Sequence, residues 1–250
     1  MKVVLLGAGT AIPARRRSPS GLYVQAGAEQ ILFDAGPGTL HRFHAAGGSF
    51  LRLRRIFLTH YHVDHCLELA TILFALRIPH PKRTRPLAIY GPPGLKRLYH
   101  ALNAAFHRWL EPRTYRLSFH ELGEATIRLR GCAVTARRMR HSAEARGYRL
   151  QAHGRRVVYS GDTDACAALV ELSRDADLLI LECSTTDERK IAGHLTPTEC
   201  GRIAAQARCR HLVLTHFYPV FEGYDIRRRV RRSYHGRLTL ARDLTSFSLF

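Results

Sequence analysis

The stretch Thr59-His60-Tyr61-His62-Val63-Asp64-His65 places three imidazoles and one carboxylate within six positions. It follows the apolar run Ile56-Phe57-Leu58, and a short, partly β-branched run of this kind is typical of a buried strand. Side chains two positions apart point to the same side of an extended chain, so His60 and His62 can bind one metal ion. Asp64 and His65 follow where the chain turns away, and they provide the first ligands for a second ion. Imidazole and carboxylate without cysteine favour Zn²⁺ or another borderline divalent metal in an open, catalytic site.

Four later strands are each predicted to end in a polar side chain. The predicted strands 132–136, 157–159, 178–181 and 212–214 are followed by His141, Asp162, Glu182 and His216. Open α/β sheets carry their sites at the carboxyl ends of the strands. One histidine after a strand is usually structural, but the series together with residues 59–65 predicts a shared metal centre.

Hydrophobic periodicity predicts strands and helices along the whole chain. The other expected strands are 2–6, 22–26, 30–33, 56–58, 87–90, 117–122 and 126–130, and the expected helices are 39–46, 67–78, 94–110, 165–174 and 198–207, with 67–78 buried. The chain has 250 residues, 46% of them hydrophobic, which is enough for a core. We therefore expect an α/β fold in which residues 1–250 form a single domain.

Composition also bears on the compartment. The six cysteines form no C-x-x-C pair and no tight framework, which favours a reduced, cytosolic protein. The apolar residues after Met1-Lys2 are too few for a signal peptide, and no apolar run approaches the length of a membrane span. We expect a cytoplasmic protein that does not enter a membrane.

The formal net charge of +19 would attract polyanions, and nucleic acid is the obvious candidate. The chain has only four lysines among its 39 basic residues, however, and this arginine skew could reflect codon usage in a GC-rich genome. The basic residues are also dispersed. Charge alone does not decide between RNA binding and plain solvation.

These motifs resemble the metallo-β-lactamase superfamily, and within it ribonuclease Z and related phosphodiesterases. The matching pieces span nearly the whole chain and are Gly7–Gly9, Phe33-Asp34-Ala35-Gly36, Thr59–His65, His141, Ser160-Gly161-Asp162-Thr163, Glu182, Gly193-His194-Leu195-Thr196 and Leu214-Thr215-His216. The resemblance implies a four-layer αββα sandwich built from two similar halves, and it implies hydrolysis of phosphodiesters.

The same resemblance implies roles for individual residues. Two metal ions are expected, most simply Zn²⁺, with Mn²⁺ or Fe²⁺ as alternatives. His60, His62 and His141 would hold one ion, Asp64, His65 and His216 would hold the other, and Asp162 would bridge them. Asp34 would orient a ligand imidazole by accepting its other N–H. The expected catalytic residues are Asp64, which accepts the proton of the attacking hydroxide or orients that hydroxide, His194, which protonates or stabilises the leaving oxygen, and Glu182, which holds His194.

The chain departs from typical ribonuclease Z in one interval. There a long arm that grips tRNA is inserted between the positions matching His141 and Asp162, and Ser142 to Gly161 is too short for it. Either tRNA is held by the basic surface or by another chain, which leaves a homodimer open, or the substrate is a smaller phosphodiester.

Four functions are therefore compared. The leading one is a dinuclear zinc phosphodiesterase acting on RNA, such as an endonuclease for tRNA 3′ ends. The second is a phosphodiesterase for small or cyclic nucleotide-like esters, which would show a shallower salt dependence than RNA binding. The third is a thioester, lactone or lactam hydrolase on the same metal site. The fourth is a non-catalytic scaffold that binds nucleic acid, which the complete ligand set disfavours, because buried charges without a metal are costly.

Overall fold

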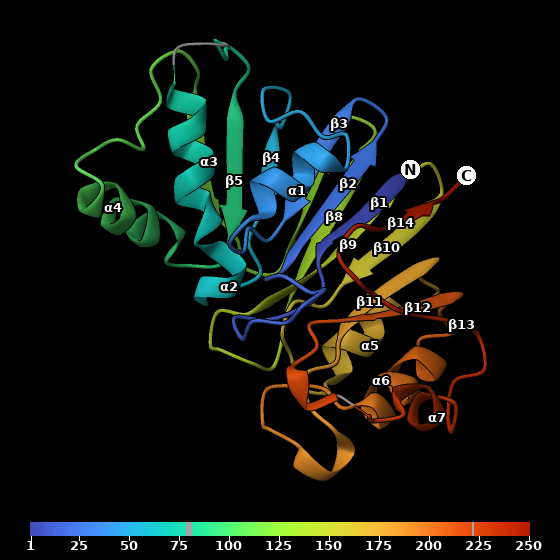
Figure 1. The fold of residues 1–250 in the computed structure, drawn as a ribbon. Helices are drawn as coiled ribbons and strands as arrows, with labels where there is room; N and C mark the ends of the chain where they lie inside the picture. Colours follow the sequence, from blue (N-terminus) through green and yellow to red (C-terminus); the bar gives the residue numbers. More distant parts are fainter. Residues whose placement is uncertain (79–81, 222) are drawn as a thin grey trace.

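The structure is a computed structural model that describes residues 1–78, 82–221 and 223–250. Two seven-stranded sheets form its centre (Figure 1). The first has the order β14-β1-β2-β3-β4-β5-β6, with β1 Lys2–Gly7, β2 Gly21–Ala26, β3 Glu29–Phe33, β4 Arg55–Phe57, β5 Leu87–Gly91, β6 Leu117–Glu121 and β14 Thr245–Ser248. The second has the order β13-β12-β11-β10-β9-β8-β7, with β7 Ala125–Leu129, β8 Cys132–Arg138, β9 Arg146–Ala152, β10 Arg155–Tyr159, β11 Leu178–Glu182, β12 His211–Thr215 and β13 Arg237–Leu240.

The two sheets repeat one pairing pattern. In the first sheet β14, β1, β2 and β3 pair antiparallel, and β4, β5 and β6 then follow parallel to β3. In the second sheet β7 to β10 pair antiparallel, and β11, β12 and β13 follow parallel to β10. Strand β3 therefore corresponds to β10, β4 to β11, and β5 to β12, as expected for two similar halves.

The sequence explains which strands take which place. Strand β11 reads Leu-Leu-Ile-Leu-Glu and is buried at every position, as parallel strands covered on both faces require. Strand β8 alternates between buried and partly exposed side chains, which is typical of an antiparallel strand with one face on the core.

Helices cover the outer face of each sheet. Helices α1 Thr39–Ala45, α2 Val63–Cys66, α3 Glu68–Arg77 and α4 Leu95–Ala105 belong to the first half, and α5 Ala167–Ser173, α6 Pro197–Gln206 and α7 Ile226–Val230 to the second (Figure 1). One buried cluster lies between the sheets and includes Phe33 and Ile180. A second joins the first sheet to α1, α3 and α4, and a third joins the second sheet to α5, α6 and α7. The order is thus helices, sheet, sheet, helices, and the predicted four-layer αββα fold is confirmed.

Some predicted elements differ from the observed ones. The helix expected over 94–110 ends at Ala105, because His107 and Arg108 adopt positive φ angles of 48° and 64° that no α-helix accommodates. The helix expected over 67–78 is not fully buried, since Leu67, Phe74 and Ile78 are exposed. Strands β9, β13 and β14 were not predicted, since each is short or interrupted by arginine.

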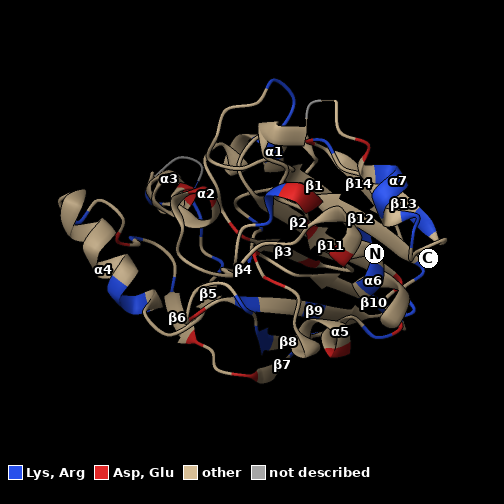
Figure 2. Ribbon diagram, turned by 90° about the horizontal axis from the view of Figure 1, so that it is seen from below, with Lys and Arg blue, Asp and Glu red and all other residues tan. Residues whose placement is uncertain are grey.

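Two further expectations concern charge and membranes. Figure 2 shows basic residues on α4, α6, α7 and the end of β8, so the positive charge is spread over many elements. Among the described residues, no helix is both long and apolar enough to cross a membrane. That residues 1–250 form a single domain stays a prediction.

Candidate metal centre

The histidine-rich loop leaves the carboxyl end of β4. The chain bends at Thr59 and is extended at His62, and α2 begins at Val63, so that Asp64 and His65 lie in its first turn. The rings of His60 and His62 are 4.6 Å apart between centroids, and they lie on the same side as predicted. His60 is buried and His62 is exposed, so the loop runs from the core to the surface.

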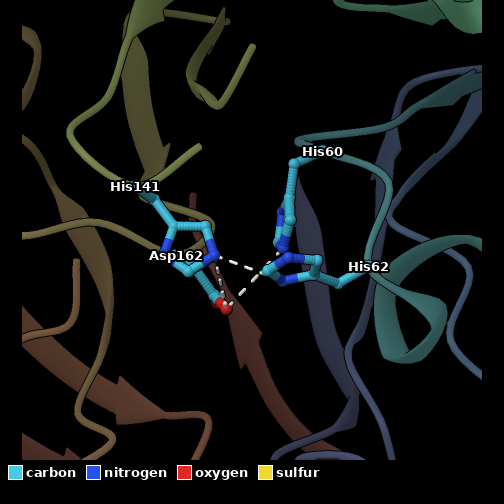
Figure 3. Close-up of side chains that lie close together, drawn as sticks. All are labelled: His60, His62, His141 and Asp162. Atoms are coloured by element: carbon cyan, nitrogen blue, oxygen red, sulfur yellow. Dashed lines mark hydrogen bonds and ion pairs between the residues drawn. The ribbon is translucent and has the colours of Figure 1, made fainter. Parts of the chain in front are cut away.

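The first group of potential ligands consists of His60, His62, His141 and Asp162, which face one another in Figure 3. Their ligand atoms all lie within 4.8 Å of one another. Oδ2 of Asp162 is 3.7 Å from Nε2 of His60 and 3.9 Å from Nε2 of His141. Nε2 of His141 is 3.2 Å from Nδ1 of His62.

The second group consists of Asp64, His65 and His216, all buried. Nε2 of His216 is 3.2 Å from Nε2 of His65 and 3.5 Å from Oδ2 of Asp64. The other oxygen of Asp162, Oδ1, is 3.3 Å from His65 and 3.5 Å from His216. Asp162 therefore directs one oxygen to each group, which is the arrangement that a bridging carboxylate requires.

Two buried atoms show that the donor set fits a pair of divalent cations. Within the described residues, Nε2 of His60 and Oδ1 of Asp162 are buried and have no hydrogen-bond partner. Unpaired buried polar atoms are costly, and a bound cation would compensate both. Burial, with a contribution from the nearby His65, lowers the pKa of His60 to about 2, so its imidazole is neutral and keeps a free lone pair. The clusters are consistent with a two-metal site.

Asp34 contacts the second group through the Nδ1 atom of His65, on the side of the ring away from the other ligand atoms. This fully buried carboxylate accepts hydrogen bonds from Nδ1 of His65 at 2.7 Å, from the amide of Thr59 at 2.7 Å and from the hydroxyl of Tyr159 at 2.8 Å. Because Nδ1 of His65 donates to Asp34, its Nε2 is left to face Asp64, Asp162 and His216. This is the contact that was predicted for Asp34.

Backbone strain marks the same region. Asp34 and His216 each adopt a φ of 59°, which costs a residue other than glycine about 1–3 kcal/mol. Each follows a strand of its sheet, β3 and β12 respectively. Both strained residues contact His65, Asp34 at its Nδ1 and His216 at its Nε2.

Two other imidazoles are oriented in the same manner. Nδ1 of His141 donates to the carbonyl of Gly193 at 2.9 Å, and Nδ1 of His216 lies 2.9 Å from the hydroxyl of Ser184. Gly193 has a φ of 87°, and a Cβ there would lie 3.0 Å from Nδ1 of His141. Only glycine allows the loop to approach this closely.

His194 and Glu182 lie beside both groups. Nδ1 of His194 is 2.9 Å from Oε1 of the buried Glu182, which also accepts a hydrogen bond from the amide of Thr163. The ring of His194 is 4.8 Å from that of His141 and 6.0 Å from that of His216. Burial opposes protonation of His194, but the hydrogen bond to Glu182 outweighs it and raises the pKa of His194 above its usual value. The predicted pair is thus brought together next to the metal-binding groups.

Lys190 supports the candidate site, although the sequence pattern assigned no role to it. Its ammonium lies 2.7 Å from Oδ1 of Asp164 and 2.6 Å from Oε2 of Glu199, and it donates to the carbonyl of His194. Oδ2 of Asp164 in turn accepts from the amide of Gly193 at 3.1 Å. Lys190 thereby ties the Gly193-His194 loop to the loop after β10 and to α6. The available signal was its rarity, since it is one of four lysines in an arginine-rich chain.

The comparisons with known proteins agree with this geometry. A family model described as a β-lactamase superfamily domain matches residues 29–217. Ribonuclease Z of Myxococcus xanthus is 31% identical over 271 aligned positions that cover 86% of this chain and 86% of that protein. Ribonuclease Z of Streptomyces coelicolor is 31% identical over 306 positions that cover 98% of this chain and 96% of that protein. Because 306 positions exceed the 250 residues of this chain, the alignment passes over segments of the relative that this chain lacks.

Two solved structures are similar over nearly their whole length. The short form of human tRNase Z matches with a TM-score of 0.80 and 27% identity, covering 99% of each chain. The metallo-β-lactamase fold protein YhfI from Bacillus subtilis matches with a TM-score of 0.86 and 24% identity, covering 98% of each chain, and supports the fold alone.

Proposed function

The chain belongs to the metallo-β-lactamase superfamily and is related to ribonuclease Z, and we propose that it is a dinuclear metallohydrolase that cleaves phosphodiester bonds in RNA. The observation that carries this proposal is the contact between His194 and Glu182 beside two ligand groups that share Asp162. A proton donor next to a pair of cations suits a reaction in which a leaving oxygen must be protonated.

We propose that each of the two groups of side chains holds one metal ion. His60, His62 and His141 hold one ion, Asp64, His65 and His216 hold the other, and Asp162 bridges them; the nitrogen and oxygen donors suit Zn²⁺, and also Mn²⁺ or Fe²⁺. When bound, two divalent cations supply a nucleophilic water at neutral pH and neutralise charge that develops on the phosphoryl oxygens.

The protein's own residues position the substrate and move the proton. His194 donates its proton to the leaving oxygen, and Glu182 holds the imidazole by its Nδ1 so that Nε2 is free to donate. Burial alone would raise the pKa of Asp64, but the hydrogen bond with His216 outweighs burial and lowers this pKa below its usual value. Asp64 is ionised, as a metal ligand requires, and it orients the nucleophile or accepts its proton.

The relatives and the charge favour RNA as the substrate. Proteins named ribonuclease Z are 31% identical to this chain over most of its length, and its net charge is +19. The name tRNase Z of a similar structure points to tRNA, and the tRNA 3′ end implied by the sequence resemblance is the site that we propose. A small or cyclic phosphodiester is the second candidate, because residues 142–161 are taken up largely by β9 and β10 and leave no room for a tRNA-gripping arm.

The other two functions receive less support. A thioester, lactone or lactam hydrolase would leave the His194–Glu182 pair without a task. A non-catalytic scaffold does not explain why two buried atoms, Nε2 of His60 and Oδ1 of Asp162, lack partners within the described residues.

The proposal is tested by substrate and metal content together. Purified wild-type protein is assayed on precursor tRNA, on cyclic and linear nucleotide diesters, on bis(p-nitrophenyl) phosphate, and on a thioester and a lactam, and metal is measured in the same samples. We expect about two ions per chain and turnover of diesters only. Replacing His194 by alanine should lower kcat by about 10²- to 10⁴-fold and leave the metal content unchanged. Loss of metal from this variant would instead make His194 a ligand, and turnover of acyl substrates would overturn the proposed reaction.

A homodimer also stays a proposal, with one surface in its support. Phe74 of α3 and Phe106 and Trp109 after α4 are exposed and line a cavity of about 540 Å³. Exposed apolar surface of this kind often marks an interface. Sedimentation at several protein concentrations would check it, with Trp109→Glu expected to weaken any dimer.

A further inference from the structure

A second cleft adjoins the candidate metal centre on the side of His141. Its volume is about 490 Å³, and it lies between the end of β8, the loop of residues 139–143 and the residues around the start of α5. His141 forms part of its wall, while Nε2 of the same ring faces Asp162. The cleft and the candidate metal centre therefore share His141, whose ring lies between them.

Two arginines line this cleft, Arg138 and Arg140. Their backbones are fixed, since the amide of Arg138 donates to Glu124 at 3.0 Å and the amide of Arg140 donates to the hydroxyl of Thr163 at 3.1 Å. Both side chains are exposed, and neither guanidinium forms a hydrogen bond or an ion pair with any part of the chain that the structure describes. The backbone thus holds two free positive groups at the mouth of the cleft.

The cleft differs from a second hollow near α7, which is lined by basic residues such as Arg202, Arg229 and Arg232 and by the acidic residues Asp187 and Glu199. There Arg229 pairs with Glu188 and lies near Asp187, so its charge is already partly compensated. In the His141 cleft the carboxylate of Glu124 is turned to the backbone of Arg138. A guanidinium group can bind a phosphate through two parallel hydrogen bonds. Because Arg138 and Arg140 have no carboxylate partner among the described residues, their guanidinium groups are available to bind a phosphate of a ligand.

We propose that this cleft binds a second phosphate of a single-stranded RNA end, one nucleotide or more from the bond that is cleaved. The proposal rests on the proposed phosphodiesterase function and names its substrate class. A diester with a single phosphate fills only the metal centre and leaves Arg138 and Arg140 unused. A strand with several phosphates engages both.

The test compares two double variants that remove the same charge. Arg138→Gln with Arg140→Gln alters the cleft. Arg227→Gln with Arg228→Gln alters two exposed arginines on α7, which lies away from β8 in Figures 1 and 2. Each metal-loaded protein is assayed with an oligoribonucleotide that has a 3′ extension and with bis(p-nitrophenyl) phosphate. Binding of the fluorescently labelled oligoribonucleotide is measured over a range of salt concentrations.

For the cleft variant we expect kcat/KM on RNA to fall by about 10- to 100-fold, mainly through KM, as loss of two charge-assisted phosphate contacts implies. This loss should exceed the loss on bis(p-nitrophenyl) phosphate by at least tenfold. The slope of log affinity against log salt should become shallower by about 0.7 for each lost contact. The α7 variant should show neither change.

Other outcomes overturn the proposal. Equal losses in both double variants would mean that only bulk charge attracts RNA. Equal losses on RNA and on bis(p-nitrophenyl) phosphate would mean that the arginines support the metal centre itself. A wild-type protein that binds RNA but hydrolyses no diester would refute the proposed function, while the binding comparison would still decide the role of the cleft.

Discussion

The two halves of the molecule each form a sheet of the same topology, but they contribute different polar residues to the candidate metal centre. In the first half, the loop after β4 and the first turn of α2 supply His60, His62, Asp64 and His65 within six positions. In the second half, His141, Asp162 and His216 come from three separate loops. The shared sheet topology therefore brings side chains from both halves to one place. The position of the polar residues in the sequence nevertheless differs between the halves.

The corresponding strands β3 and β10 show the difference most clearly. In both sheets the pairing changes from antiparallel to parallel at this strand, and both strands are followed by a residue with positive φ, Asp34 at 59° and Gly161 at 58°. In the first half the carboxylate after the strand contacts His65 through its Nδ1, from outside the ligand groups. In the second half the carboxylate after the strand, Asp162, lies between the two groups. We therefore expect substitutions at these two positions to differ strongly.

The largest effect is expected for Asp162→Ala. Because Asp162 directs an oxygen to each group, its loss should release both metal ions together and lower hydrolysis by about 10³-fold or more. Metal analysis of the purified variant checks this, with Glu171→Ala, which removes an exposed carboxylate on α5, as control. Retention of one firmly bound ion would show that the two groups bind metal independently.

This contrast also explains how much could be predicted. The segment of residues 59–65 was recognisable because its candidate ligands are close together in the sequence and follow an apolar strand. His141, Asp162, Glu182 and His216 could be suspected only because each follows a predicted strand. Gly193-His194 follows no strand, and its role came from the resemblance alone.

The resemblance gave the contacts of Asp34 and Glu182, but other supporting contacts were not predicted. The hydroxyl of Tyr159 donates to Asp34 across 125 positions of the sequence, and the ammonium of Lys190 contacts Asp164 across 26. Periodicity indicates which face of an element is buried, but it does not indicate which distant side chain lies opposite. Strand β9 was missed for a related reason, because glycine and arginine obscure its alternation and its pairing with β8 is what stabilises it.

A smaller and more selective effect is expected for Asp34→Asn. The amide can still accept one hydrogen bond, but it removes the charge that holds His65, so the affinity for one ion should fall by about 10- to 100-fold. The other ion should be retained. Chelator titration followed by metal analysis separates the two. Ser184→Ala, which removes the neutral partner of His216 in the second half, should weaken the same ion less. Simultaneous release of both ions from the Asp34 variant would contradict the difference drawn between the halves.

The second half also contains His194, the proposed proton donor, and the pH dependence of this role can be tested through Glu182→Gln. If protonated His194 is the acid, kcat is full below the pKa of His194 and falls as pH rises through it. Since Glu182 raises this pKa against the effect of burial, the substitution should move the alkaline limb to lower pH and reduce activity several-fold on that limb. A pH profile of kcat beside that of Glu171→Gln, an exposed carboxylate on α5, provides the measurement. An unchanged limb would assign the titration to another group.

The smallest expected effect concerns the helix that follows His194. Helix α6 begins with a capping box, in which Thr196 accepts from the amide of Glu199 and the carboxylate of Glu199 accepts from the amide of Thr196. Helices α1 and α4 of the first half follow Gly38 and Gly94 and have no side-chain cap. Thr196→Ala should therefore lower the free energy of unfolding by about 1 kcal/mol, seen as a lower denaturant midpoint with an unchanged slope. Thr196→Ser keeps the hydroxyl and should recover most of this loss. If serine destabilises as much as alanine, the methyl group of Thr196 and its packing, rather than the cap, stabilise the start of α6.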